Sequence, residues 1–475
     1  MKGSIKVVIG TQWGDEAKGK ISDFIKEELG GKVDAFARFQ GGNNAGHTIV
    51  FGGTKYKLNY LPAGAASGHK AILGHDMVIH VPYLKKEIES LKDTPWDPKT
   101  QLFISDKAHV TIDQQIVMDG VLRKLQGKFS AESTLRGIAP TYAYKMFRSG
   151  IRFVDLLDYE LLKQRLTILF NEMRPIFEKI SEQDMAGVGE SLEKWYGDFG
   201  RQVFENGKTL DAEAVAQRYY EFGLQLKNNI QDINLVIRDL YDAGGTIIAE
   251  GAQGIMLDIT QGAYPYTTSS NIGPGAACTG LGITPKMIDE VIGVVKVMGS
   301  RVGAGPLPTE LIADKDLDIT QQTQDKIAKE TNEFGTTTGR MRRIMWPDAV
   351  CLKHAARICG FDRIALTKLD MIPIVTNNTN TKHAKIGVKY TTSAGKVHER
   401  APPSNWNKVE GCKVEYESFP IWKNLDSKEW LELSDKGELP KEMLDYAKRI
   451  AEIMGVKDMI LSFGPEREAT RSYSI

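Results

Sequence analysis

The sequence is poor in the features that mark secreted, zinc-binding and membrane proteins. It has only four cysteines in 475 residues, and none of them forms a C-x-x-C pair. Few, scattered cysteines disfavour a disulfide framework or a zinc site and are typical of a reduced cytosolic protein. The chain opens MKGSIKVVIG, which favours a strand over a signal peptide, and has no apolar run long enough to cross a bilayer. We therefore expect a cytoplasmic globular protein.

The sequence also lacks a net charge, internal repeats and low-complexity segments. Lysine plus arginine and aspartate plus glutamate number 61 each, so the formal net charge at pH 7 is zero. This balance gives no overall attraction to nucleic acid or to an anionic membrane, and we expect neither as a partner. The length allows one large domain or two to three smaller ones. Because no stretch has the composition of a linker, we expect one elaborated domain over residues 1–475.

Apolar patterns near the start of the chain indicate the fold class. The apolar run Ile5–Ile9 is typical of a strand buried on both faces of a parallel sheet. Apolar residues then recur at helical spacing from Ile21 to Leu29, and Ala35–Phe39 reads as a second strand. A strand, loop, helix and strand in this order predict an α/β fold with a large, mostly parallel twisted sheet flanked by helices.

Later segments extend this fold. Further strand-like runs at 246–254, 291–299 and 363–370 each end in a polar, charged or glycine-rich turn. Residues of about 155–245 read mostly as helices, and the hydrophilic stretch near 378–412 reads as a surface extension of loops and small strands. Ligands of such folds bind beyond the carboxyl ends of the strands, so we expect a binding site where these turns meet.

The turn after the first strand resembles a phosphate-binding loop. Gly14–Lys20 fits the spacing G-x-x-x-x-G-K, but Ile21 stands where a hydroxyl residue normally holds magnesium. The loop contains four charged residues: Asp15, Glu16, Lys18 and Lys20. Lysines and backbone N–H groups at a helix start attract phosphate, while a carboxylate can hold magnesium or act as a base. The alternative is a solvent-facing turn whose charges happen to fit.

The segment TKLD, Thr367–Asp370, predicts recognition of guanine. An aspartate carboxylate at the end of a strand can accept hydrogen bonds from both N1–H and the 2-amino group of guanine, a paired donor edge that adenine lacks. The methylene stem of Lys368 can lie over the base. A strand followed by a charged turn is the simpler alternative. Together with the first loop, however, the segment favours a P-loop-like GTP site.

Three more stretches combine small residues with polar side chains. Gln40–Thr48 lets the backbone approach a ligand closely and ends near His47, which can act as an acid or an oxyanion partner. Glu333–Arg343 supplies hydroxyl groups and guanidinium forks that suit carboxylate and phosphate oxygens. Glu250–Asn271 can bind a base and sugar edge. For these stretches the alternatives are a structural histidine and exposed loops.

These five stretches, in this order, resemble the adenylosuccinate synthetase family over nearly the whole chain. The matching motifs are WGDE-KGK, QGG-NAGHT, EGAQG, YP-TSSN, RVGAGP-PTEL, NEFG-TTGR, LTKLD and the closing S-GP-R at 462–467. The resemblance implies a GTP-dependent C–N ligase that joins L-aspartate to IMP and yields adenylosuccinate, GDP and phosphate. It also implies the first committed step of AMP synthesis, a magnesium ion and a homodimer.

The resemblance assigns chemical roles to five residues. Asp15 removes the proton from N1 of IMP, after which the 6-oxygen attacks the γ-phosphate of GTP. His47 stabilises that oxygen, Lys18 neutralises the transferring phosphoryl group, and Gln253 completes the catalytic set. The aspartate amine then displaces phosphate from 6-phosphoryl-IMP. Asp15 and the backbone carbonyl of Gly46 are the implied magnesium ligands, so the carboxylate within the loop replaces the missing hydroxyl.

The resemblance also assigns three sets of binding residues. The IMP set is Asp15, Lys18, Asn44, His47, Thr134, Arg148, Gln253, Thr268 and Arg340, with Arg148 reaching the site of the partner subunit. The aspartate set is Thr336, Thr337, Thr338 and Arg340. The GTP set is Gly14, Glu16, Ala17, Gly19, Lys20, Gly46, Thr48, Arg342, Lys368, Asp370, Ser462 and Gly464.

Six residues depart from the family pattern: Ala17, His75, Leu135, Ala139, Tyr144 and Phe463. Ala17 stands where the family loop has glycine, so its methyl group would strain the backbone if φ is positive there. These departures leave open a paralogue that uses another purine nucleotide such as dGMP, although Asp15 argues against the related viral branch, which has lost this aspartate. A catalytically silent GTP-binding protein is the third alternative, but such a protein needs neither His47 nor the threonine-rich loop.

Overall fold

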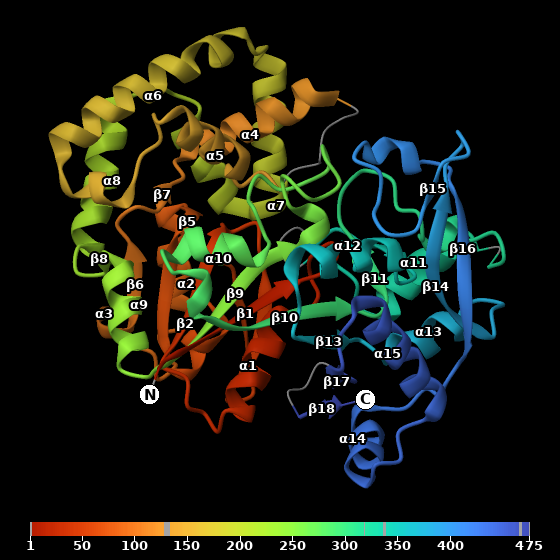
Figure 1. Cartoon of the computed structure of the whole chain (residues 1–475). Coiled ribbons are helices and arrows are strands. Elements are labelled where there is room, and N and C mark those ends of the chain that lie inside the picture. The colour runs from red at the N-terminus through yellow and green to blue at the C-terminus, as the bar shows by residue number, and fades with distance from the viewer. Residues whose placement is uncertain (1, 128–133, 318, 336–338, 465–467, 475) are drawn as a thin grey trace.

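A large sheet occupies the centre of the computed structural model (Figure 1), which describes residues 2–127, 134–317, 319–335, 339–464 and 468–474. Within these residues the sheet has eleven strands in the order β18-β17-β13-β10-β1-β9-β2-β5-β6-β8, with β7 paired to β5. The strands are β1 (Ser4–Gly10), β2 (Ala35–Gly41), β5 (Lys70–Ile79), β6 (Leu102–Ser105), β7 (His109–Val110), β8 (Ile230–Gln231), β9 (Thr246–Gly254), β10 (Ile288–Lys296), β13 (Arg363–Thr367), β17 (Asp458–Ser462) and β18 (Thr470–Ser474). Every pairing is parallel except β17–β18, which confirms the predicted fold class.

The central strand β1 shows why its sequence is apolar without a break. It pairs with β9 on one side and β10 on the other, and its two faces are both covered. Val7 and Ile9 belong to the largest hydrophobic cluster of the protein, whereas Val8 packs with Ile21 and Ile25 of helix α1 (Lys18–Glu28). Successive side chains of a strand point to opposite faces, so a strand covered on both sides requires apolar residues at consecutive positions.

The segment predicted to be helical carries most of the helices beside one end of the sheet (Figure 1). It contains η3 (Phe153–Leu157), α6 (Tyr159–Lys179), α7 (Glu182–Gly207), α8 (Ala212–Leu226) and α9 (Ile233–Asp242). Helix α7 is broken at Gly197, where φ is 59°. Of two further helices, α4 (Asp113–Gln126) packs along α7, and α5 (Ile138–Phe147) packs against α4.

The other helices cover the sheet and its ends. They are η1 (Ala63–Ser67), α2 (Val81–Ser90), α3 (Pro98–Gln101), η4 (Ile255–Leu257), α10 (Pro274–Leu281), η5 (Pro285–Met287), η6 (Leu311–Ala313), α11 (Gln321–Glu330), α12 (Ala349–Cys359), α13 (Met371–Asn377), η7 (Trp406–Val409), α14 (Ser427–Lys436) and α15 (Lys441–Met454). None of the helices in the described ranges is long and apolar enough to span a membrane.

Three small antiparallel sheets complete the fold. The hydrophilic extension forms the sheet β15-β14-β16, with β14 (His383–Thr391), β15 (Val397–His398) and β16 (Lys413–Pro420), at the right of Figure 1. The strands β3 (His47–Phe51) and β4 (Thr54–Leu58) form a hairpin, and β11 (Gly299–Arg301) pairs with β12 (Arg343–Met345). The last pair brings the arginine-rich loop beside the end of β10.

Candidate functional site

A cavity of about 830 Å³ opens beyond the carboxyl ends of the central parallel strands. Loops that follow β1, β2, β9 and β13 contribute to its wall. The predicted site residues among those that line it are Gly14, Asp15, Ala17, Lys18, Gly19, Lys20, Asn44, Gly46, His47, Thr48, Thr134, Gln253, Thr268, Arg340, Arg342, Lys368, Asp370, Ser462 and Gly464. Segments from both ends of the chain therefore meet in one cavity.

The first loop ends in the helix start that its glycine-lysine pattern predicts. Ala17 is the N-cap of α1, and the first helical residues, Lys18, Gly19 and Lys20, all line the cavity. The exposed N–H groups of a helix start favour an anion. The ammonium group of Lys20 donates to Ser462 Oγ (2.7 Å) and to the carbonyl oxygen of Gly464 (2.5 Å), which joins the first loop to the end of β17.

Glu16 holds the loop together and turns away from the cavity. Its carboxylate is fully buried and accepts hydrogen bonds from the backbone N–H groups of Gln12 (3.2 Å) and Gly14 (2.8 Å). It also pairs with the ammonium group of Lys18 at 2.7 Å. Glu16 is not among the described residues that line the cavity. Its buried side chain therefore stabilises the loop rather than facing a ligand.

Ala17 has the left-handed backbone conformation for which glycine is suited, with φ 71° and ψ 36°. A left-handed residue other than glycine costs about 1–2 kcal/mol. We expect Ala17→Gly to raise the free energy of unfolding by about 1 kcal/mol, because glycine removes this strain but adds freedom to the unfolded chain. Urea denaturation measures the change. As a control, Ala214→Gly at an exposed position of helix α8 should destabilise by about 1 kcal/mol. Equal losses in both variants would contradict strain at Ala17.

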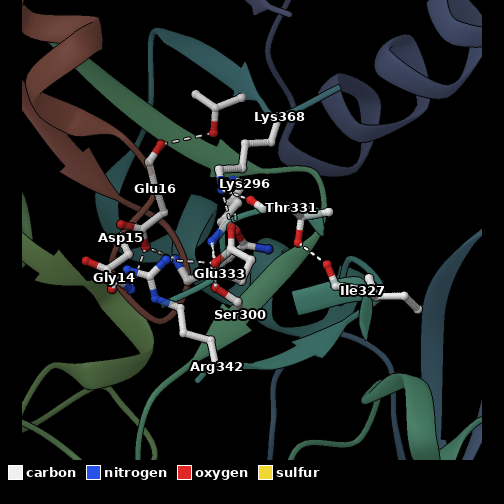
Figure 2. Close-up of polar contacts among 12 residues, drawn as sticks. Gly14, Asp15, Glu16, Lys296, Ser300, Ile327, Thr331, Glu333, Arg342 and Lys368 are labelled. Carbon is white, nitrogen blue, oxygen red and sulfur yellow. Dashed lines mark hydrogen bonds and ion pairs between the residues drawn. The ribbon is translucent and has the colours of Figure 1, made fainter. Parts of the chain in front are cut away.

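A buried cluster of charges lies beside the first loop (Figure 2). Glu333 is fully buried and pairs through Oε2 with Lys296 (2.5 Å) and with Arg342 Nη1 (2.8 Å). Its other carboxylate oxygen pairs with the ammonium group of Lys368. The second nitrogen of Arg342, Nη2, lies 2.6 Å from Asp15 Oδ2. Arg342 thus connects Asp15, the predicted general base, to Glu333, and Glu333 in turn pairs with Lys368 of the predicted guanine site.

The protonation of this cluster follows from burial and from its charges. Burial alone would raise the pKa of Glu333, but its three cationic neighbours hold that pKa well below the usual value. Burial lowers the pKa of Lys296, and the charges of Lys368 and Arg342 lower it further. Burial alone would also lower the pKa of Arg342, yet Asp15 and Glu333 raise it. Glu333 is therefore a permanent anion among cations.

His47 and Gln253 present unpaired polar atoms to the cavity. His47 Nδ1 lies 3.4 Å from Glu250 Oε1, whereas Nε2 is buried with no hydrogen-bond partner among the described residues. Burial lowers the pKa of His47, and Arg38 and Lys18 add to the effect. Both amide atoms of Gln253 likewise have no partner in the described part of the chain, and its φ is 55°. Buried polar atoms are normally satisfied, so these atoms indicate a ligand.

The imidazole ring of His47 lies against Gly19 at the start of helix α1. A Cβ atom at Gly19 would lie 3.0 Å from His47 Cδ2, so a side chain there would push the imidazole away. In the loop that precedes His47, the side chain of Asn44 donates to Thr268 Oγ1 at 3.2 Å. Thr134 accepts a hydrogen bond at its carbonyl oxygen from the hydroxyl of Tyr196 on α7.

Two predicted residues in the described structure, Glu16 and Arg148, do not line the cavity. Arg148 is exposed at the end of α5, with φ 69°, and is not among the described residues that line the cavity. Thr336, Thr337 and Thr338 lie outside the described residues. Arg340, which follows them, does line the cavity, and its guanidinium group lies 5.2 Å from the ring centroid of Trp195 on α7.

Most departures from the family pattern lie away from the cavity. Phe463 is buried and stacks on Trp430 of α14, with ring centroids 5.1 Å apart. His75 bonds to Ser105 and Asn234, each at 2.6 Å. Leu135 and Tyr144 are buried and are not among the described lining residues. The departures that line the cavity are Ala17 and Ala139, so these two are the candidates for a changed nucleotide preference.

The structure adds residues to which the sequence assigned no role. Glu333 begins a predicted loop, but nothing in its motif shows that it is buried among three cations. Lys296 ends the apolar strand β10, and a lysine that follows a buried strand is a signal of a possible site. Glu250 begins another predicted stretch, yet only the structure shows that it faces His47. Trp195 and Tyr196 lie in the middle of an amphipathic helix and carry no local signal.

Comparisons with known proteins agree on one family. The family model for adenylosuccinate synthetase matches residues 7–471. A curated adenylosuccinate synthetase from Streptococcus gordonii is 35% identical over 465 residues, which cover 98% of this chain and 97% of the relative. The structure of the fully ligated adenylosuccinate synthetase from Plasmodium falciparum matches with a TM-score of 0.80 and 30% identity, covering 98% of this chain and 99% of that one.

A second solved structure shares the fold alone. It is the succinoaminodeoxyadenylate synthetase of cyanophage S-2L, bound to dGMP and to dATP as an energy donor. It matches with a TM-score of 0.50 and 17% identity, covering 87% of this chain and 96% of that one.

Proposed function

The chain belongs to the adenylosuccinate synthetase family, and from this premise we propose that it joins L-aspartate to IMP through a 6-phosphoryl-IMP intermediate. GTP supplies the phosphoryl group, and the products are adenylosuccinate, GDP and phosphate. The observation that supports this proposal most directly is the cavity of about 830 Å³, whose wall combines the helix-start loop, His47, Gln253 and the guanine-site segment. The reaction needs a phosphate site, a purine site and a carboxylate site next to one another.

The proposed chemistry begins with a proton transfer. Asp15 takes the proton from N1 of IMP, which places negative charge on the 6-oxygen. This oxygen attacks the γ-phosphorus of GTP and the bond to GDP breaks, while Lys18 and the N-terminus of α1 stabilise the charge of the transferring group. His47 lines the cavity, and its Nε2, which has no hydrogen-bond partner among the described residues, stabilises the 6-oxygen. The amine of L-aspartate then attacks C6, and phosphate leaves.

Asp15 in the first loop and Gly46 in the loop after β2 offer donor atoms of the type that magnesium prefers. Asp15 and Gly46 both line the cavity and offer a carboxylate and a carbonyl oxygen, the hard donors that magnesium prefers, with phosphate oxygens as further ligands. In the described residues no group of three or more histidine, cysteine, aspartate or glutamate side chains is placed to hold a metal, and phosphate oxygens and water would complete the magnesium shell. When bound, magnesium neutralises charge on the phosphates.

The test of this function is a product assay. Purified protein is incubated with IMP, GTP and magnesium, with and without L-aspartate, and the nucleotide product is identified by mass. We expect a succinyl-purine product and equal release of GDP, both dependent on aspartate. If no product forms from IMP while GTP still binds, dGMP replaces IMP in the same assay. Product from dGMP would establish the paralogue, and no product from either would favour a silent GTP-binding protein.

We further propose that the enzyme acts as a homodimer in the cytoplasm, with Arg148 reaching the neighbouring site. Arg148 is exposed beside Met146 and Phe147, whose side chains are 70% and 68% exposed. Large apolar side chains next to one another on a surface are typical of an interface. If a second subunit covers Met146 and Phe147, Arg148 lies at the interface and can reach the IMP site of that second subunit.

Replacement of Arg148 tests the shared site. We expect Arg148→Ala to raise the KM for IMP about tenfold, since a charge-assisted contact with phosphate is lost, and to leave the KM for GTP within about twofold. Steady-state kinetics measure both constants, and sedimentation velocity measures the mass. Arg152→Ala, a nearby arginine before η3, is the control and should leave both constants unchanged. A monomeric parent protein at micromolar concentration would exclude the shared site.

A further inference from the structure

The carboxylate of Glu333 contacts Lys368 of the guanine-site segment and Arg342 of the arginine-rich loop. The proposed assignment gives Glu333 itself no contact with a substrate. It is fully buried and is not among the described residues that line the cavity. Two of its cationic partners, Arg342 and Lys368, do line the cavity. Glu333 therefore has two direct connections to a ligand in the cavity, the side chains of Arg342 and Lys368.

The backbone of Glu333 fixes its position as firmly as its side chain does. Its N–H group donates to the carbonyl oxygen of Ala328 (2.7 Å), and its own carbonyl oxygen accepts from the N–H group of Arg342 (3.0 Å). The N–H group of Gly335 donates to the carbonyl oxygen of Arg340 at 2.7 Å. Glu333 thus sits at the closed base of the loop that carries the predicted aspartate-binding residues.

The carboxylate holds Lys368 in one position. Lys368 has φ 61°, so its backbone adopts a left-handed conformation, and its ammonium group pairs with Glu333 Oε1. A lysine side chain has several rotatable bonds, and an exposed one samples many rotamers. The ion pair fixes the ammonium end of the Lys368 side chain, and the methylene stem is therefore held along the cavity wall.

The same carboxylate holds Arg342 between two anions. Arg342 Nη1 lies 2.8 Å from Glu333 Oε2, while Nη2 lies 2.6 Å from Asp15 Oδ2. A planar guanidinium group held at both ends transmits the position of one carboxylate to the other. Lys296 and the hydroxyl of Ser300, at 2.5 Å and 2.8 Å, complete the shell of donors around Glu333 Oε2. Figure 2 shows these side chains converging on Glu333.

We propose that Glu333 is a positioning residue for GTP, which preorganises Lys368 for the guanine base and Arg342 for the triphosphate before the nucleotide binds. Arg342 and Lys368 line the cavity and present their cationic groups to an anionic ligand. Preorganised groups bind more tightly because their ordering cost is met during folding. The inference rests on the proposed assignment of Lys368 and Arg342 to GTP, and it predicts that loss of Glu333 weakens guanine nucleotide binding although positive charge increases.

Nucleotide binding by Glu333→Gln tests the proposal. Isothermal titration calorimetry measures the Kd for GDP and, separately, for IMP. We expect the Kd for GDP to rise about tenfold, because the charged contacts that fix Lys368 and Arg342 are lost. The Kd for IMP should rise by less than the Kd for GDP, because Glu333 reaches the IMP set only indirectly, through Arg342 and Asp15. A GDP affinity equal to that of the parent protein, or higher, overturns the proposal.

Two further variants separate positioning from stability. Asp314→Asn removes another buried carboxylate, which pairs with Lys385 at 2.8 Å away from this cluster, and should lower stability without changing the Kd for GDP. Glu333→Gln combined with Lys296→Met removes both members of one buried pair and so limits the cost of an unpaired charge. We expect the double variant to bind GDP as weakly as Glu333→Gln. Parental GDP affinity in the double variant would show that Glu333 only compensates Lys296.

The binding assay also separates this inference from the proposed function. A parent protein that binds GDP but makes no adenylosuccinate contradicts the proposed reaction, and Glu333→Gln still tests the positioning role. A parent protein that does not bind GDP contradicts the assignment of Lys368 and Arg342, and the positioning role fails with it.

Discussion

Asp15→Asn is expected to lower kcat by about a thousandfold. General base catalysis contributes about 10²–10⁴ to a rate, and asparagine cannot accept the N1 proton at neutral pH. The replacement also removes the proposed carboxylate ligand of magnesium. The amide keeps the size of the side chain, and Arg342 retains its pair with Glu333 at 2.8 Å, so the site should keep its shape. The Kd for IMP should therefore change by less than about threefold.

Single-turnover measurements separate the chemical step from binding in this variant. Enzyme in excess over limiting IMP is mixed with saturating GTP and aspartate, and adenylosuccinate is measured over time. Asp23→Asn is the matched control: Asp23 lies on helix α1, which follows the loop of Asp15, and pairs with Lys26 at 2.9 Å outside the cavity, so this variant should keep the parental rate. If Asp15→Asn retained more than about a tenth of the parental rate, another group would have to be the base.

Asp370→Asn is expected to exchange guanine for xanthine specificity. In the proposed complex the carboxylate accepts hydrogen bonds from N1–H and from the 2-amino group of guanine. An asparagine amide donates towards that amino group, so one favourable contact becomes an unfavourable one. Xanthine has an oxygen at position 2, which accepts from the same amide. We expect kcat/KM for GTP to fall about a hundredfold or more, because hydrogen bonds to charged groups contribute about 1.5–3 kcal/mol each.

The measurement compares GTP with xanthosine triphosphate in the same assay of adenylosuccinate formation. The ratio of the two kcat/KM values should shift towards xanthosine triphosphate in Asp370→Asn. Asp362→Asn is the control. Asp362 precedes the amino end of β13, whereas Asp370 follows its carboxyl end at the cavity, so this variant should leave the ratio unchanged. An unaltered ratio in Asp370→Asn would place the base elsewhere in the cavity.

Much of the fold could be predicted because its signals are local. The apolar run in β1, the helical spacing that follows Lys20 and the turns after β9 and β13 each lie within about ten residues. These patterns identify buried parallel strands, and such strands place their following loops at one edge of the sheet. The gathering of the glycine-rich loops into one cavity could therefore be anticipated without knowledge of the strand order.

The interior of the site could not be predicted, because it depends on which distant side chains meet. Nothing in the sequence pairs Glu333 with Lys296, and nothing shows that Glu16 turns behind its own loop to bond to Gly14. From the sequence alone, the large side chain of Phe463 suggests crowding of the nucleotide site. In the structure it instead stacks on Trp430. Burial of a charged group and the direction of a side chain are properties of tertiary packing, on which local spacing carries little information.

The strand order also has a consequence during synthesis on the ribosome. The partners of β1 are β9 and β10, so the first strand to be made must wait for residues as far along as Lys296. At about 5–20 residues per second this delay is roughly 15–60 s. The bond from Lys20 to Ser462 forms later still, when β17 has emerged. The nascent chain therefore exposes an apolar strand throughout most of translation, and the phosphate-binding loop matures only as the last strands join the sheet.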